Sequence, residues 1–152
     1  MGDRTTVQLT VMKEDVQAVA EVYGLEVSEE YKNSEELTLR TFIFYDVNYG
    51  ELDGLDKLME AGIPFNSHWE DGCTYTAGTT YCRFTQDGFI QELSVYDNNQ
   101  NPDLNKLMEL LNDNEALVKY IKDFHRNTIP LSWSTQLENR KVYLTKKLID
   151  AH

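Results

Sequence analysis

Basic residues are scarce in this chain, and their scarcity excludes several kinds of partner. The 152 residues include 14 lysines and arginines against 26 aspartates and glutamates, so the net charge is −12 at pH 7. A free-standing DNA or RNA binder needs clustered lysines and arginines to neutralise phosphates, and adhesion to an anionic membrane surface needs the same residues. We therefore expect no direct contact with nucleic acid and no contact with a membrane.

Long apolar runs are also missing, and cysteines are few. The densest apolar stretch, Thr41–Tyr45, is far shorter than the about 20 residues that cross a bilayer. The first residues, Met1–Thr6, lack the apolar segment of a secretory signal. Cys73 and Cys82 are too few for the disulfide framework of a small secreted protein. These absences predict a cytoplasmic protein with two partly buried thiols.

Apolar periodicity predicts a single α+β domain over residues 1–152. Alternating apolar residues predict strands at 5–12, 37–47, 65–70, 73–85 and 89–97. Apolar stripes at helical spacing predict helices from Lys13 to Gly24, Leu52 to Gly62, Asn101 to Leu111, Asn114 to Phe124 and Ser134 to Ile149. This order indicates a mainly antiparallel sheet of about five strands, with helices packed on one side and a helical C-terminal region.

Local signals refine that expectation at four places. Apolar residues on both faces of segment 37–47 predict a central strand. Asp71-Gly72 and 86–88 separate β-prone runs and predict the turns of an antiparallel meander. Asn101-Pro102 predicts an N-cap followed by a first-turn proline. In the last region, Lys141–Leu144 leaves an edge strand open as an alternative to helix.

Charge is distributed unevenly along the chain. Residues 1–100 carry 19 acids and 6 bases, whereas residues 101–152 carry 7 acids and 8 bases. Segment 26–36 holds five glutamates and one lysine, which predicts a solvated acidic connection. The simple explanation of this asymmetry is solvated surface. The alternative is an acidic face presented to a basic partner, because such a field steers association.

The sequence offers no strong catalytic or metal signature. His68, Cys73, Cys82 and His125 have the atoms for a zinc site, but their spacings of 5, 9 and 43 lack the close pairs typical of zinc ligands. We therefore expect no metal and no cofactor. A cysteine and histidine pair acting as nucleophile and base stays open as a chemical alternative.

Aromatic residues are the more informative feature, because tyrosine and tryptophan are enriched where proteins bind proteins. Several tyrosines and Trp69 fall in and around the predicted sheet, although many of them could simply pack under the helices. The candidate partner-binding residues are the acids Glu51, Asp53, Asp56, Glu60, Glu70 and Asp71, with Tyr49 and Trp69 as aromatic anchors.

The middle of the chain resembles a group of small proteins carried by bacterial plasmids, integrative elements and phages. The resemblance covers about residues 45–84 and is carried by Asn48-Tyr49-Gly50-Glu51-Leu52, Leu58-Met59-Glu60-Ala61-Gly62-Ile63-Pro64-Phe65, Trp69-Glu70-Asp71-Gly72 and Tyr81-Cys82-Arg83-Phe84. These short motifs are rich in apolar residues and glycine, so they mark a fold more than a site. The resemblance brings no activity and no functional residue, but it implies accessory DNA, where small acidic proteins counter host defences.

These observations favour a non-enzymatic binding protein of a mobile element or phage. We expect it to inhibit a host defence protein, such as a CRISPR or restriction effector, by occupying a basic surface. One alternative is an immunity or antitoxin-like protein that neutralises a toxin, in which case a toxin gene should lie beside its gene. The other is a small hydrolase that uses Cys73 or Cys82 with a histidine.

Overall fold

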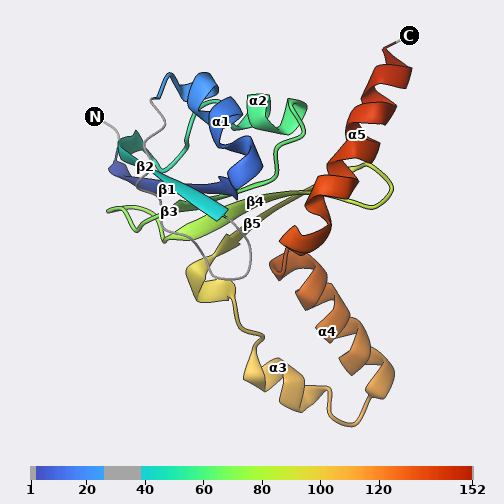
Figure 1. Cartoon of the computed structure of the whole chain (residues 1–152). Helices are drawn as coiled ribbons and strands as arrows, with labels where there is room; N and C mark the ends of the chain where they lie inside the picture. Colours follow the sequence, from blue (N-terminus) through green and yellow to red (C-terminus); the bar gives the residue numbers. More distant parts are fainter. Residues whose placement is uncertain (1–2, 26–38, 152) are drawn as a thin grey trace.

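The computed structural model describes residues 3–25 and 39–151, and these residues form an α+β fold, as predicted. Its centre is a five-stranded sheet with the order β2-β1-β3-β4-β5, in which every neighbouring pair is antiparallel (Figure 1). The strands are β1 (Arg4–Met12), β2 (Leu39–Asn48), β3 (Phe65–Trp69), β4 (Gly78–Phe84) and β5 (Ile90–Tyr96). The predicted acidic connection at 26–36 lies outside the described residues.

The helices divide into a group on the sheet and a group that extends away from it. Their bounds are η1 (Lys13–Asp15), α1 (Val16–Tyr23), α2 (Leu55–Glu60), η2 (Asp97–Asn99), α3 (Leu104–Glu109), α4 (Asn114–Thr128), η3 (Trp133–Thr135) and α5 (Gln136–Asp150). Figure 1 shows α1 and α2 together on one face of the sheet, α5 beside them, and α3 and α4 projecting from the body. None of the described helices is long and apolar enough to cross a membrane.

The hydrophobic core lies between the sheet and helices α1 and α2. Phe65 of β3 and Cys82 of β4 are register partners, and both are fully buried. They belong to one cluster with Val19 of α1 and Leu58 of α2. Because side chains alternate along a strand, one face of each strand supplies this core, as the alternation in the sequence predicted.

The position of β2 contradicts the prediction of a central strand. In the described sheet β2 is one of the two edge strands and pairs only with β1. Phe42 is buried under the helices, but Ile43 and Tyr45, which lie on the other side of the strand, are exposed. Apolar residues on two faces of a strand therefore do not mean that both faces are buried.

Two other local predictions were wrong, and the prediction of a last helix is confirmed. The strand predicted at 73–85 begins only at Gly78, so Asp71-Gly72 opens a longer connection and not a tight hairpin. The N-cap of α3 is Asp103, whose side chain accepts a hydrogen bond from Asn105 N at 2.9 Å, and not Asn101. Segment 141–144 is helical, which removes the edge-strand alternative.

Buried Arg83 attaches the segment before α5 to the sheet. Its guanidinium donates to Leu131 O at 2.9 Å, to Phe65 O at 2.9 Å and to the Asn66 side chain at 2.6 Å. It also lies 3.8 Å from the ring centroid of Trp133. Desolvation lowers the pKa of Arg83 to about 10, so the group is still charged at neutral pH.

Candidate functional site

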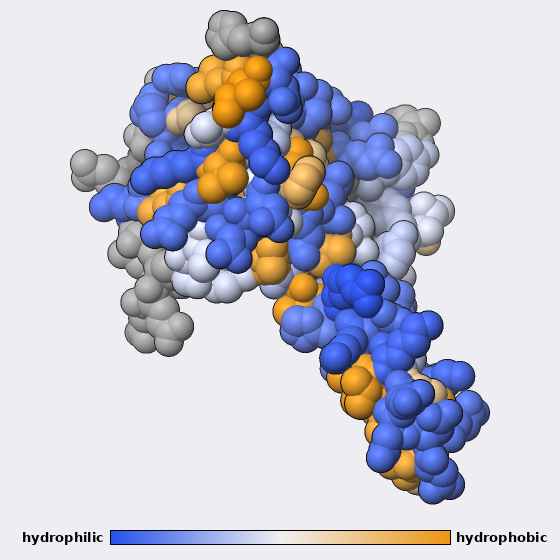
Figure 2. Space-filling view, turned by 90° about the vertical axis from the view of Figure 1, so that its right-hand side faces the viewer, coloured by the Kyte–Doolittle hydropathy of each residue, from blue (hydrophilic) through white to orange (hydrophobic). Residues whose placement is uncertain are grey.

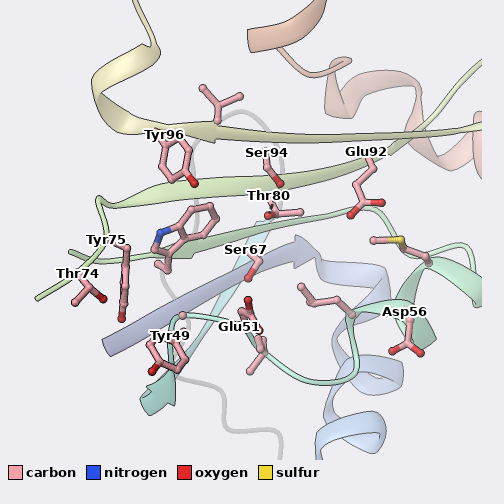
Figure 3. Close-up of a pocket in the computed structure, with 16 residues that line it drawn as sticks. Tyr49, Glu51, Asp56, Ser67, Thr74, Tyr75, Thr80, Glu92, Ser94 and Tyr96 are labelled. Atoms are coloured by element: carbon pink, nitrogen blue, oxygen red, sulfur yellow. Dashed lines mark hydrogen bonds between the residues drawn. The ribbon is translucent and has the colours of Figure 1, made fainter. Parts of the chain in front are cut away.

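A groove with a volume of about 810 Å³ lies on the helix-covered face of the sheet, beside α2. It exists because α2 has only six residues and leaves part of β3, β4 and β5 uncovered. Figure 3 shows two opposing walls, with Tyr49 and Glu51 on one side and Glu92, Ser94 and Tyr96 of β5 on the other. Sixteen residues from five segments of the chain line this groove.

The floor of the groove is a row of small hydroxyl side chains. Ser67, Thr80 and Ser94 are register partners across β3, β4 and β5, so their side chains lie side by side on one face. Thr80 Oγ1 and Ser94 Oγ share a hydrogen bond of 2.9 Å. Because these side chains are small, they leave an open space beside α2. The next register pair on the same face, Phe65 and Cys82, is fully buried and fills the core instead.

Trp69 closes one end of the groove and is held between two glycines. A Cβ atom at Gly50 would lie 2.7 Å from Trp69 Cβ, and one at Gly78 would lie 2.5 Å from Trp69 Cζ2. The indole Nε1 donates to Thr76 O at 2.9 Å. Tyr96 contacts the indole edge to face, with ring centroids 6.1 Å apart. The indole therefore has a fixed orientation at the end of the groove.

Two further tyrosines extend this aromatic end. The rings of Tyr49 and Tyr75 are tilted against each other with centroids 6.4 Å apart. Tyr49 has a left-handed backbone (φ 54°), and its N–H donates to Asp3 O at 2.6 Å. Such a backbone is uncommon outside glycine and is kept only where surrounding contacts impose it. The connection after β2 is thus built to place Tyr49 beside the groove.

The charged side chains of the groove are all acidic. Glu51 precedes α2, Asp56 lies on α2, and Glu92 lies on β5, and all three are exposed to solvent. Among the described residues that line the groove there is no lysine, arginine or histidine. Carboxylates with aromatic faces nearby are the groups that bind an ammonium or a guanidinium. The groove is therefore suited to a cationic ligand.

The structure brings together four of the eight residues that the sequence singled out. Tyr49, Glu51, Asp56 and Trp69 line the groove. The other four, Asp53, Glu60, Glu70 and Asp71, do not line it. The Asp71 carboxylate has a structural role, because it accepts a hydrogen bond from Ala77 N at 2.5 Å and shapes the connection before β4.

Sequence reasoning missed the opposite wall and the floor. Glu92, Ser94 and Tyr96 alternate along one strand, and this alternation of polar and aromatic residues was a readable signal. Ser67 and Thr80 carried no such signal, since their position under the groove depends on the register between β3 and β4.

The thiols and histidines do not assemble a reactive site in the described part of the chain. Cys82 is fully buried, and burial raises its pKa from 9.0 to about 12, so the nucleophilic thiolate is disfavoured. His68 lies on the opposite face of the sheet, where its Nε2 is 3.2 Å from Asp97. Cys73 is exposed, which corrects the expectation of two partly buried thiols. No three His, Cys, Asp or Glu side chains among the described residues are placed to hold one metal ion.

Comparison of the chain with protein-family models, with curated proteins and with solved structures finds no match. The chemistry of the groove is therefore the main indication of a ligand. Its carboxylates and its aromatic end favour a positively charged group.

Proposed function

We propose that this protein binds another protein by taking basic side chains of its partner into the acidic groove, and that it has no catalytic role of its own. The observation that carries the proposal is the convergence of Glu51 and Asp56, from the segment around α2, with Glu92 of β5 on one groove with an aromatic end. A lysine or arginine side chain would place its charge between these carboxylates. Its aliphatic stem would pack on Trp69 or Tyr96.

The size and openness of the groove favour side chains of a macromolecule. Its volume of about 810 Å³ holds more than one lysine or arginine, and its acids are exposed at the rim. Exposed rim charges act mainly by steering a partner of opposite charge, whereas buried aromatic anchors set the lifetime of the complex. A net charge of −12 adds a long-range attraction to basic surfaces.

The resemblance to proteins of plasmids, integrative elements and phages suggests which basic surface this is. In that setting, the protein acts in the cytoplasm and inhibits a host defence protein that binds nucleic acid. The phosphate-binding surface of such a protein already favours anions, so carboxylates of the groove compete with the phosphates. Inhibition then follows from occupancy alone.

The test uses two variants with the same change in charge. In the groove variant, Glu51→Gln, Asp56→Asn and Glu92→Gln remove three charges from the groove. In the control variant, Asp53→Asn, Glu60→Gln and Glu70→Gln remove three charges outside it. Proteins retained from a host lysate by each immobilised protein are identified at low and high salt. The interaction of each purified partner is then measured directly.

We expect the groove variant to lose a nucleic-acid-binding partner that the wild type and the control variant retain. High salt should weaken retention by the wild type, because charge pairs are screened. Equal retention of that partner by both variants would contradict the role of the groove. A partner with toxin activity would instead identify the protein as an immunity protein.

A further inference from the structure

Helices α3 and α4, with the connection between them, form an arm that projects from the sheet (Figure 1). The structure describes both helices in full, and no residue in either of them is buried. A hydrogen bond of 3.2 Å from Asp103 N to the Tyr120 hydroxyl connects the two helices. Short helices are marginally stable without tertiary packing, and an arm whose apolar side chains are at most half-buried has little of this source of stability.

The arm exposes an apolar surface, which is visible at its tip in Figure 2. Leu104, Met108 and Leu111 follow one another at helical spacing along and just after α3, and Val118 and Ile121 lie on α4. Their exposed fractions lie between 47% and 70%. Several exposed apolar residues at helical spacing on one helical hairpin are typical of an interaction surface.

The charge of the arm points to the kind of partner. Residues 104–128 carry four acids and four bases and are therefore neutral, in a protein with a net charge of −12. The charges along α4 are unevenly placed: Glu115 lies in the first turn, whereas Lys119, Lys122 and Arg126 follow toward the C-terminal end, where Asp123 pairs with Arg126. A basic partner or an acidic partner would match only one half of this helix.

A second copy of the same helix, running antiparallel, matches both halves. Glu115 of one copy then lies opposite Lys122 of the other, and the reverse pair forms by symmetry. These residues also border a shallow hollow of about 540 Å³ along α4, with Val118 at its side. An antiparallel neighbour would fill this hollow and cover the apolar surface.

We propose that α3 and α4 of two copies pack around a two-fold axis and form an antiparallel four-helix bundle. Helix α4 has 15 residues and spans about 22 Å, so the two acidic bodies lie at opposite ends of the bundle. That separation exceeds the Debye length of about 8 Å at physiological salt, which limits their repulsion. The interface is the same patch on both copies, so assembly closes at the dimer. The inference is independent of the groove.

The test is the mass of the full chain in solution across a range of concentrations, measured by sedimentation equilibrium. We expect the mass to rise from 17.6 kDa to twice that value. Met108→Glu and Ile121→Glu should each raise the dimer dissociation constant by at least about tenfold, because each places a charge in an apolar contact. Leu148→Glu, the same kind of change at an exposed apolar residue of α5, is the matched control and should leave the constant unchanged.

A charge exchange tests the antiparallel arrangement without altering the apolar surface. Glu115→Lys and Lys122→Glu should each weaken dimerisation by about two- to fivefold, and the double variant should restore it. Circular dichroism identifies any variant of Met108 or Ile121 that loses its helices. If such a loss occurs, the effect of the charge exchange on dimerisation is the test of the interface. A wild-type mass of 17.6 kDa at every concentration, growth beyond the dimer, or equal effects of Ile121→Glu and Leu148→Glu would overturn the proposal.

Discussion

The side-chain amide of Gln136 hydrogen-bonds both backbone groups of Phe84. Phe84 N donates to Gln136 Oε1 at 2.7 Å, and Gln136 Nε2 donates to Phe84 O at 3.1 Å. Gln136 is the first residue of α5 and is fully buried. Its amide supplies the hydrogen bonds that a neighbouring strand would give to the backbone N–H and carbonyl at the end of β4. Asn139, one turn later, donates to the same carbonyl at 2.8 Å. These bonds position α5 against the sheet.

Replacing Gln136 by leucine should therefore destabilise the protein. The Phe84 N–H would be buried without an acceptor, which costs about 1–3 kcal/mol. The free energy of unfolding, measured with urea, should fall by that amount. Gln17→Leu, the same change at an exposed position of α1, should alter it by less than about 0.5 kcal/mol. Equal effects of the two substitutions would contradict the structural role of Gln136.

Gly50→Ala should disturb the aromatic end of the groove. Gly50 has a φ of 68°, and an added Cβ would lie 2.7 Å from Trp69 Cβ, so backbone strain and a steric clash act together. Gly24→Ala is a matched control, because Gly24 has a φ of 65° but nothing within 4 Å of the added atom. Gly24→Ala should lower the free energy of unfolding by about 1 kcal/mol, and Gly50→Ala should lower it by at least about twice as much.

The same pair of variants has a spectroscopic readout. In a Trp133→Phe background, the near-ultraviolet circular dichroism of Trp69 should change with Gly50→Ala and stay constant with Gly24→Ala. An unchanged Trp69 signal in Gly50→Ala would show that the glycine does not hold the indole in place.

The two thiols should differ in reactivity. Cys73 is exposed and Cys82 is fully buried, with a pKa that burial raises to about 12. Because the thiolate is the reactive form, native protein at pH 8 should react with one equivalent of an aromatic disulfide reagent and unfolded protein with two. Cys73→Ser should abolish the reaction of the native protein. Rapid reaction of Cys82 in that variant would revive the hydrolase alternative.

Stability should decline in alkaline solution, and Cys82 should account for part of the decline. In the unfolded chain this thiol loses its proton near pH 9, whereas in the folded protein it keeps the proton up to about pH 12. The unfolded state therefore binds fewer protons in this window, and the free energy of unfolding falls as pH rises. Cys82→Ala should be less stable at pH 7 but should show a shallower fall above pH 9.

The predicted elements that the structure confirmed were those with a strong local pattern. Alternation at Val7, Leu9 and Val11 predicted β1, and the apolar stripe that begins after Asn114 predicted α4. Local periodicity reports which side of an element is apolar, because it follows directly from strand and helix geometry. It does not report neighbours, so the place of β2 at the edge of the sheet could not be read from its apolar residues.

The residues of the candidate groove also differ in whether local sequence could identify them. Tyr49, Glu51, Asp56 and Trp69 were identifiable because charge and aromatic residues concentrate in one stretch of the sequence. Their meeting with Glu92 was decided by the register that aligns β3, β4 and β5. Register depends on contacts between residues far apart in the chain, and a shift of one residue would turn Glu92 to the other face of the sheet. Sequence thus determined the chemistry available to this protein, whereas tertiary packing decided which groups share a groove.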